Sequence, residues 1–172
     1  GDFATSPFET GGNSWTNHAD ALGDDAADAD MAIGMFDTSL SKGLKLTAPV
    51  DGAGTDGSDT VDKIRIVFKR RSEDASSARD GHVRLLNPDG TVDATELAGL
   101  ARYWPTTEAY SYMHVVNAPA GFASYADIGD VDVGLAISTQ ANGAPFPGNP
   151  SHVQYAALWV YHTGGYVPFP AG

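Results

Sequence analysis

The sequence predicts an all-β fold, an antiparallel β-sandwich of about eight strands with a jelly-roll-like arrangement. Three observations predict it: apolar and polar residues alternate with period two, Gly- and Pro-rich turns recur at short intervals, and almost no stretch has helical periodicity. Strands at this spacing indicate a sandwich or a barrel. With 172 residues, the chain is long enough for one domain with a substantial core.

The clearest strand is 61–71, and the rest of the chain is expected to be built around it. One set of alternate positions is apolar, comprising Ile64, Ile66 and Phe68. The positions that point the other way are basic, comprising Lys63, Arg65 and Lys69. This pattern predicts a strand with one buried face and one exposed face.

The chain before this strand divides into an irregular start, a loop and two short strands. Residues 1–17 are polar, dotted with aromatics and broken by Pro7 and Gly11-Gly12. Residues 18–30 are rich in Ala and Asp, which indicates a loop with one helical turn. Segments 31–36 and 44–48 are predicted to be strands that form a hairpin.

After the central strand, a polar connection leads to four more predicted strands. They lie at 81–86, 110–116, 131–139 and 153–162. Asn87-Pro88-Asp89-Gly90 has the Pro and Gly placement of a tight turn, which predicts a hairpin after the first of them. We therefore divide the chain into an N-terminal arm (1–17), a β-sandwich domain (18–163) and a Pro- and aromatic-rich C-terminal tail (164–172).

The two ends carry aromatic residues between Pro and Gly, which keep them out of regular elements. We expect these residues to contact a partner, and the candidates are Phe3, Phe8, Tyr166 and Phe169. The alternative is that these rings cover the protein's own sandwich.

Charge and cysteine content exclude several classes of function. A net charge of −12 argues against nucleic acid or an anionic membrane surface as the main partner. All ten Lys and Arg lie between positions 42 and 102, so copies of the chain could pack basic against acidic surfaces, unless the charges are simply solvated. The absence of cysteine removes disulfides, thiolate zinc sites and cysteine nucleophiles.

Targeting segments are not expected either. No apolar run approaches the roughly 20 residues that cross a bilayer. Residues 1–6 have neither a basic nor an apolar leader region, so we expect a lost initiator Met rather than a removed leader.

Motifs for catalysis and metal binding are weak, so we expect no enzyme activity and no cofactor. The five histidines lack zinc spacing, and neither a G-x-S-x-G elbow nor a phosphate-binding loop occurs. Segment 85–96 resembles an EF-hand loop, but Leu85 stands where the first ligand should be, which favours a hairpin turn.

Calcium is the one ion for which the sequence offers ligands. The candidates are Asp24, Asp25, Asp28 and Asp30. A second acidic group comprises Asp51, Asp56, Asp59 and Asp62. We expect a solvated acidic loop, in which a basic neighbour offsets the repulsion between like charges, and calcium binding is the alternative.

Trp15, Trp104, Trp159 and several tyrosines are the residue types that stack on sugars, so a carbohydrate-binding face is an alternative. We expect most of them to be structural. Trp159 would lie on a buried strand face, and Trp104 would close the end of the sandwich. The residues predicted to share the buried face with Trp159 are Val153, Tyr155, Ala157 and Tyr161.

The order of short motifs along the chain resembles that of β-sandwich structural proteins of tailed bacteriophages, which have relatives among bacterial surface proteins. The motifs are segments 13–17, 63–71, 83–85, 104–110 and 133–137, and the aromatic strand that ends at Tyr161. The chain departs from the group in two ways. After the 110–116 strand it has Ala120-Gly121-Phe122 in place of a Trp-Gly pair, and it adds the tail 166–170.

The resemblance implies a non-enzymatic virion protein, for example a capsid decoration or head-accessory protein. Its partners would be its own copies and a major capsid or other virion protein. The alternatives are a secreted carbohydrate-binding or adhesion module and an extracellular filament subunit.

Overall fold

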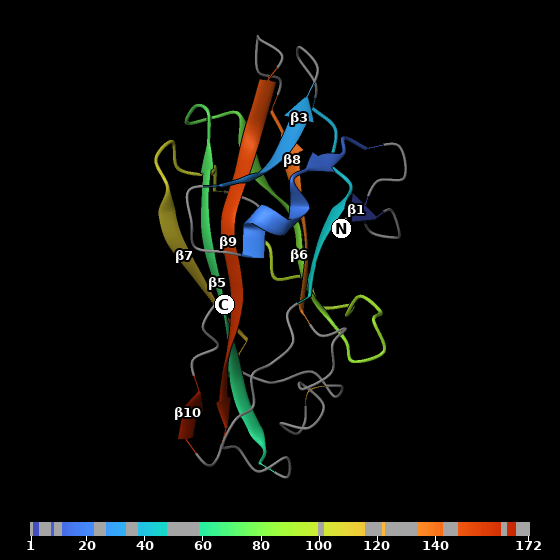
Figure 1. Cartoon of the computed structure of the whole chain (residues 1–172), viewed down its shortest axis with the longest axis vertical. Helices are drawn as coiled ribbons and strands as arrows, with labels where there is room; N and C mark the ends of the chain where they lie inside the picture. The colour runs from blue at the N-terminus through green and yellow to red at the C-terminus, as the bar shows by residue number, and fades with distance from the viewer. Residues whose placement is uncertain are drawn as a thin grey trace.

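The computed structural model describes residues 2–3, 8, 12–22, 27–33, 38–47, 59–99, 102–115, 122, 134–142, 148–162 and 165–167. Within these ranges the chain forms ten strands and a 3-10 helix, η1 (His18–Leu22). The strands make two antiparallel sheets that pack around one main core (Figure 1). The predicted all-β sandwich is confirmed.

The six-stranded sheet has the long strand β9 (Gly148–His162) at its centre. β9 pairs with β5 (Val61–Ser72) on one side and β3 (Ala29–Ile33) on the other. The remaining strands are β2 (Trp15–Thr16) next to β3, β7 (Ala109–Val115) next to β5, and β10 (Gly165–Val167), which pairs with one end of β9.

The four-stranded sheet has the order β1 (Asp2–Phe3), β4 (Gly43–Thr47), β8 (Gly134–Ala141) and β6 (Ala78–Leu86). Successive strands alternate between the two sheets, as β3 and β4, β5 and β6, and β8 and β9 do. The orders β3-β9-β5-β7 and β4-β8-β6 are those of a jelly roll in which the fourth strand of the second sheet is irregular.

The predicted hairpin between 31–36 and 44–48 is wrong. Both segments contain strands, but β3 pairs with β9 and β4 pairs with β8, so the chain crosses from one sheet to the other between them. Alternation of residue types identifies a strand and does not identify its neighbour, because register depends on which face meets the core.

The central strand β5 behaves as its alternation predicts. Ile64, Ile66 and Phe68 are fully buried in the main core, together with Leu85 of β6 and Leu135 of β8. Apolar side chains from both sheets therefore fill the space between them.

A β-bulge reverses the predicted faces of β9. The register shifts so that Lys69 pairs with Tyr155 while Arg70 pairs with Val153, which leaves Gln154 without its own partner on β5. Val153 and Val160 therefore lie in the core, and Trp159 and Tyr161 remain only half-buried. The expectation that Trp159 shares a buried face with Val153 is wrong.

Short strands also occur where irregular ends were expected. β1 and β2 fall within the predicted arm (1–17), and β10 falls within the predicted tail (164–172). The described pieces of both end segments are thus paired with the sandwich.

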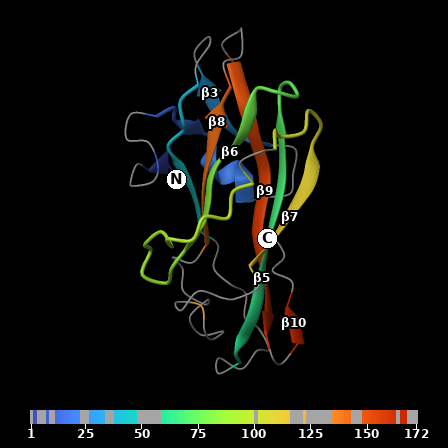
Figure 2. The same ribbon diagram turned by 180° about the vertical axis from the view of Figure 1, so that it is seen from behind.

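The segment after β6 covers the edge of the four-stranded sheet (Figure 2). The predicted turn is present, because the Gly90 N–H donates to the Asn87 carbonyl at 2.8 Å and Gly90 adopts a φ of 77°. The chain then returns along β6, where the N–H groups of Asp93, Leu97 and Trp104 donate to carbonyls of β6 at 2.9 Å. The described residues of this segment, 92–99 and 102–104, which we call the 92–104 segment, protect what would be an exposed edge.

Candidate binding site on the outer face of the six-stranded sheet

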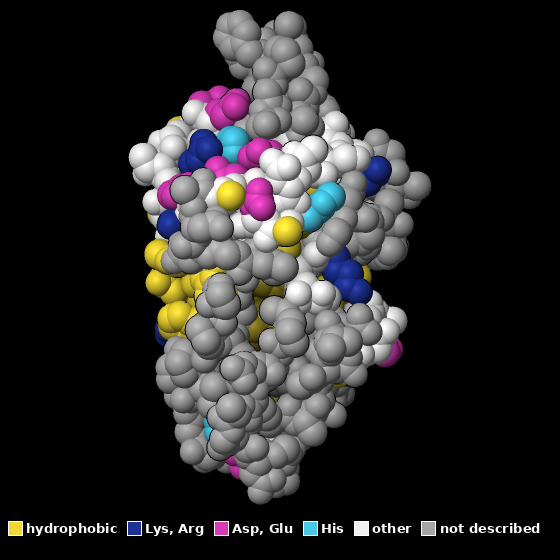
Figure 3. Space-filling model, viewed as in Figure 1, with side chains coloured by type: hydrophobic (Ala, Val, Ile, Leu, Met, Phe, Trp, Pro, Cys, Tyr) yellow, Lys and Arg dark blue, Asp and Glu magenta, His cyan; other side chains and the backbone are white. Residues whose placement is uncertain are grey.

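The outer side of β7, β5 and β9 carries a surface of aromatic and basic side chains, which we call the aromatic–basic face. It comprises Lys63, Arg65, Lys69, Tyr110, Tyr112, Tyr155, Trp159 and Tyr161. In Figure 3 hydrophobic side chains gather on the left of the molecule, at the level of β7 and β5.

The register of the three strands brings these residues together. Lys63 pairs with Tyr161, Arg65 with Trp159, and Lys69 lies between Tyr110 and Tyr155. Residues directly opposite each other on one face of a sheet are about 5 Å apart at Cβ, so each cation has an aromatic neighbour.

The aromatic rings form a continuous series. The Tyr110 and Tyr112 rings are stacked, with centroids 6.3 Å apart and an interplanar angle of 19°. Tyr112 and Trp159 are 6.4 Å apart. Tyr110 and Tyr112 keep 45% and 51% of their surfaces exposed, among the largest exposures of bulky hydrophobic side chains in the described part of the chain. Exposed aromatic groups of this kind mark interaction sites.

Two cations on this face have aromatic neighbours and, among the described residues, no acidic partner. The Arg65 guanidinium lies 5.5 Å from the centroids of Tyr112 and Trp159, and Lys63 Nζ lies 4.2 Å from that of Tyr161. Among the described residues neither cation forms an ion pair, and the buried Arg65 Nε has no hydrogen-bond partner. Lys69 differs, because Glu108 lies 3.8 Å from it.

Above the aromatic–basic face, two of the calcium candidates contact basic side chains. The Arg71 guanidinium donates to Asp28 at 2.9 Å, and His152 Nδ1 lies 2.6 Å from Asp30. The structure thus supplies basic neighbours that offset the repulsion between these carboxylates. Asp24 and Asp25 lie outside the described residues.

Asp28, Asp30 and His152 also place one ligand atom each within 4.8 Å of one another. Two carboxylates and an imidazole suit a transition metal better than calcium, which prefers oxygen ligands. The Arg71 guanidinium already occupies one carboxylate of the group. Calcium binding by this region stays an untested alternative to the expected solvated loop.

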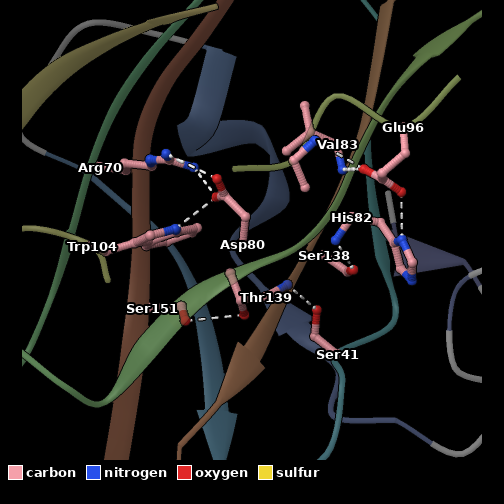
Figure 4. Close-up of polar contacts among 11 residues, drawn as sticks. Ser41, Arg70, Asp80, His82, Val83, Glu96, Trp104, Ser138, Thr139 and Ser151 are labelled. Atoms are coloured by element: carbon pink, nitrogen blue, oxygen red, sulfur yellow. Dashed lines mark hydrogen bonds and ion pairs between the residues drawn. The ribbon is translucent and has the colours of Figure 1, made fainter. Parts of the chain in front are cut away.

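A second polar cluster lies inside the sandwich and is structural (Figure 4). Arg70 of β5 forms a salt bridge with Asp80 of β6, and Trp104 Nε1 donates to the same Asp80 oxygen at 2.8 Å. All three side chains are buried, and the Arg70 guanidinium stacks 4.8 Å from a Trp104 ring. The cluster joins the two sheets and offers no surface to a ligand.

Glu96 attaches the 92–104 segment to β6. Its carboxylate accepts from the Val83 N–H at 2.9 Å and lies 2.6 Å from His82 Nδ1 (Figure 4). Burial raises the pKa of Glu96, but hydrogen bonds from Val83, His82, Ala98 and Arg84 together lower it below its ordinary value. The carboxylate is therefore held in its charged form.

Of the predicted partner-contact residues, only Phe8 has a described side chain. It is buried against Leu86 and Ala136. For this ring the structure agrees with the alternative, in which the protein's own sandwich covers the aromatic residues of the end segments. Phe3 lies in β1 and Tyr166 in β10, and nothing is described of their side chains; Phe169 lies outside the described residues.

The sequence contained part of the signal for the aromatic–basic face. The alternation predicts that Lys63, Arg65 and Lys69 lie on the side of β5 away from the core, and this is confirmed, with each side chain half-buried there. The aromatics of β9 were assigned to the core because the bulge at Gln154 has no signature in the alternation. Trp15 and Trp104 are buried and take no part in this face.

Comparison with known proteins assigns no family. No protein-family model matches the chain, and no curated protein matches its sequence. In the described part of the chain, no helix has the length and apolar character needed to cross a membrane.

Proposed function

We propose that this protein is a non-enzymatic structural protein of a phage-like particle, on the capsid surface as a decoration or head-accessory protein. It acts by binding copies of itself and a shell protein. The proposal draws its particle context from the resemblance in motif order, and its mode of action from the exposed aromatic–basic face.

The aromatic–basic face supports action by contact rather than catalysis. Tyr, Trp and Arg are the residues that dominate the binding energy of protein interfaces, and they are grouped here on a rigid sheet rather than on loops. Rigid anchors lose little conformational entropy when they dock.

The test is incorporation of the protein into particles. Particles assembled with the wild-type chain are compared with particles assembled with Tyr112→Ala, and the bound protein is quantified by mass spectrometry. We expect Tyr112→Ala to lower incorporation at least several-fold. The matched control is Tyr103→Ala, which removes a tyrosine of similar exposure, 44%, that belongs to the 92–104 segment. A wild-type chain that never co-purifies with particles contradicts the proposal.

A second candidate function is a secreted carbohydrate-binding or adhesion module. The stacked, exposed pair Tyr110 and Tyr112 favours it, since flat aromatic surfaces suit pyranose rings. A glycan array probed with the purified chain separates the two candidates.

A further inference from the structure

We infer that the aromatic–basic face binds an acidic polysaccharide, with Arg65 pairing with its carboxylates and Tyr112 stacking on its sugar rings. This ligand goes beyond the proposed particle role, and it is tested on the purified chain without particles.

The first step of the argument is charge. The chain has a net charge of −12, yet Lys63 and Arg65 form no ion pair among the described residues and lie side by side on one face. The basic residues nearby do have acidic neighbours, as Arg71 has in Asp28 and Lys69 in Glu108. Two cations that have no carboxylate partner in the described part of an acidic protein fit a ligand that supplies the carboxylates.

The second step is the setting of Arg65. Rings of Tyr112, Trp159 and Tyr161 lie 5.5 to 5.8 Å from its guanidinium and hold it by cation–π contacts. Among the described residues no ion pair uses its terminal N–H groups, which match a carboxylate in a two-bond arrangement. Arg65 is therefore fixed in place before a ligand arrives.

The third step distinguishes a sugar polymer from an acidic peptide. On this face Tyr110 and Tyr112 are exposed, and ring centroids follow one another at 6.3 and 6.4 Å with a cation beside the rings. Each unit of a uronic acid polymer offers an apolar ring face together with a carboxylate. In an acidic peptide the apolar and the acidic groups belong to different side chains, so a run of aspartates or glutamates leaves Tyr110 and Tyr112 uncovered.

The experiment measures binding of the purified chain by calorimetry to polygalacturonate, and to the same polymer with its carboxylates methyl-esterified. We expect binding to polygalacturonate that weakens as salt rises, and at least tenfold weaker binding to the ester, since a charge-assisted contact is lost at each unit. Absence of binding to polygalacturonate, or equal binding to the ester, overturns the inference.

Variants locate the site. Arg65→Gln and Tyr112→Ala are each expected to weaken binding roughly tenfold, because a charged hydrogen-bond partner or a stacking plane is removed. Arg79→Gln, in the other sheet, and Tyr103→Ala are the matched controls and are expected to bind as the wild type does. Circular dichroism and melting curves establish that each variant is folded.

Polyglutamate serves as the probe for an acidic protein partner. If it binds as tightly as polygalacturonate and depends equally on Tyr112, the face recognises acidic protein and the inference is wrong. Particle incorporation is measured separately, so failure of the polysaccharide test leaves the proposed particle role intact, and the reverse also holds.

Discussion

Arg70 and Asp80 place opposite charges between the two sheets, where neither side chain has much contact with water. Trp104 adds a hydrogen bond to Asp80, and Ser72 Oγ donates to the Trp104 carbonyl at 3.1 Å. Burying two charges is costly, and the mutual attraction offsets the cost only when both partners are present. The pair joins the two sheets and adds little net stability while both partners are present.

Removing one partner of this pair should be far more damaging than removing both. We expect Asp80→Asn to lower the free energy of unfolding by about 3–5 kcal/mol, because Arg70 keeps its charge without compensation. The double variant Arg70→Met with Asp80→Leu should lose less. Urea denaturation of the purified variants measures both values.

The exposed pair of Lys69 and Glu108 provides the control for this comparison. Glu108 lies 3.8 Å from Lys69 Nζ and 3.8 Å from Arg71 Nε, and all three side chains are partly exposed, so Glu108→Gln should change stability by less than about 1 kcal/mol. If Asp80→Asn proves as mild as Glu108→Gln, the account of the buried pair is wrong.

At the scale of elements, the pairing of β4 with β8 depends on a glycine. Gly134 lies opposite Thr47, and a Cβ at this position would collide with the Leu46 carbonyl group and lie 2.9 Å from Thr47 Cα. These neighbours are backbone atoms of the adjacent strand, which cannot rotate away.

Gly134→Ala should therefore destabilise the protein by about 1–3 kcal/mol, the usual range for overpacking a dense interior. Gly99→Ala is the matched control, since a Cβ there would meet only an Asp80 oxygen at 4.0 Å. Thermal melts of the two variants make the comparison. Similar melting temperatures would show that β4 and β8 separate more easily than their register implies.

The 92–104 segment should become pH-sensitive through Glu96. Because the folded-state pKa of Glu96 lies below its ordinary value of 4.5, its stabilisation is complete above about pH 4.5 and is lost as the pH falls through the folded pKa. We expect Glu96→Gln to show a flatter melting temperature between pH 6 and pH 3 than the wild type, as measured by calorimetry.

Glu73→Gln, which changes an exposed residue between β5 and β6, should keep the wild-type pH profile. Hydrogen exchange at the Val83 and Ala98 N–H groups reports the protonation of Glu96 locally, because both groups donate to its carboxylate. Unchanged protection of these groups at low pH would argue against Glu96 as the attachment point.

Elements were predictable from the sequence to different degrees, and the differences have physical causes. β5 was predicted almost to its ends, since apolar and basic residues alternate in it and one face meets the core. The position of β9 was predicted, but its inward and outward faces were exchanged, because one bulged residue changes which side chains face inward. β3 pairs with β9 and β4 pairs with β8. Both partner strands lie far away along the chain, so a local sequence pattern cannot predict these pairings.

Of the candidate sites, the sequence located only half of the aromatic–basic face. The exposed basic row of β5 was visible, while Tyr110 and Tyr112 come from β7, whose position beside β5 depends on the jelly-roll order. The calcium candidates Asp28 and Asp30 were proposed from local acidity alone. Their contacts with Arg71 and His152 join β5, β9 and the start of β3, which no local motif indicates.

As a whole, the molecule separates a buried polar cluster from the outer face that we propose as its interaction surface. The buried side chains of Arg70, Asp80 and Trp104 are joined by a salt bridge and a hydrogen bond, with Arg70 Nε left without a partner among the described residues. Lys63 and Arg65 of the outer face contact only aromatic rings among the described residues. This division suits a protein whose sheet stays rigid while its outer face contacts partners.

The central place of β9 in the six-stranded sheet has a consequence for synthesis on the ribosome. β9 pairs with β3, β5 and β10, and its first residue is Gly148, so the sheet lacks its middle strand until most of the chain has been translated. Long-range pairing of this kind makes folding slow and leaves unpaired strand edges exposed meanwhile. Nascent chains stalled before residue 148 should therefore be digested rapidly by protease, and protection should appear only once residues 148–162 have left the exit tunnel.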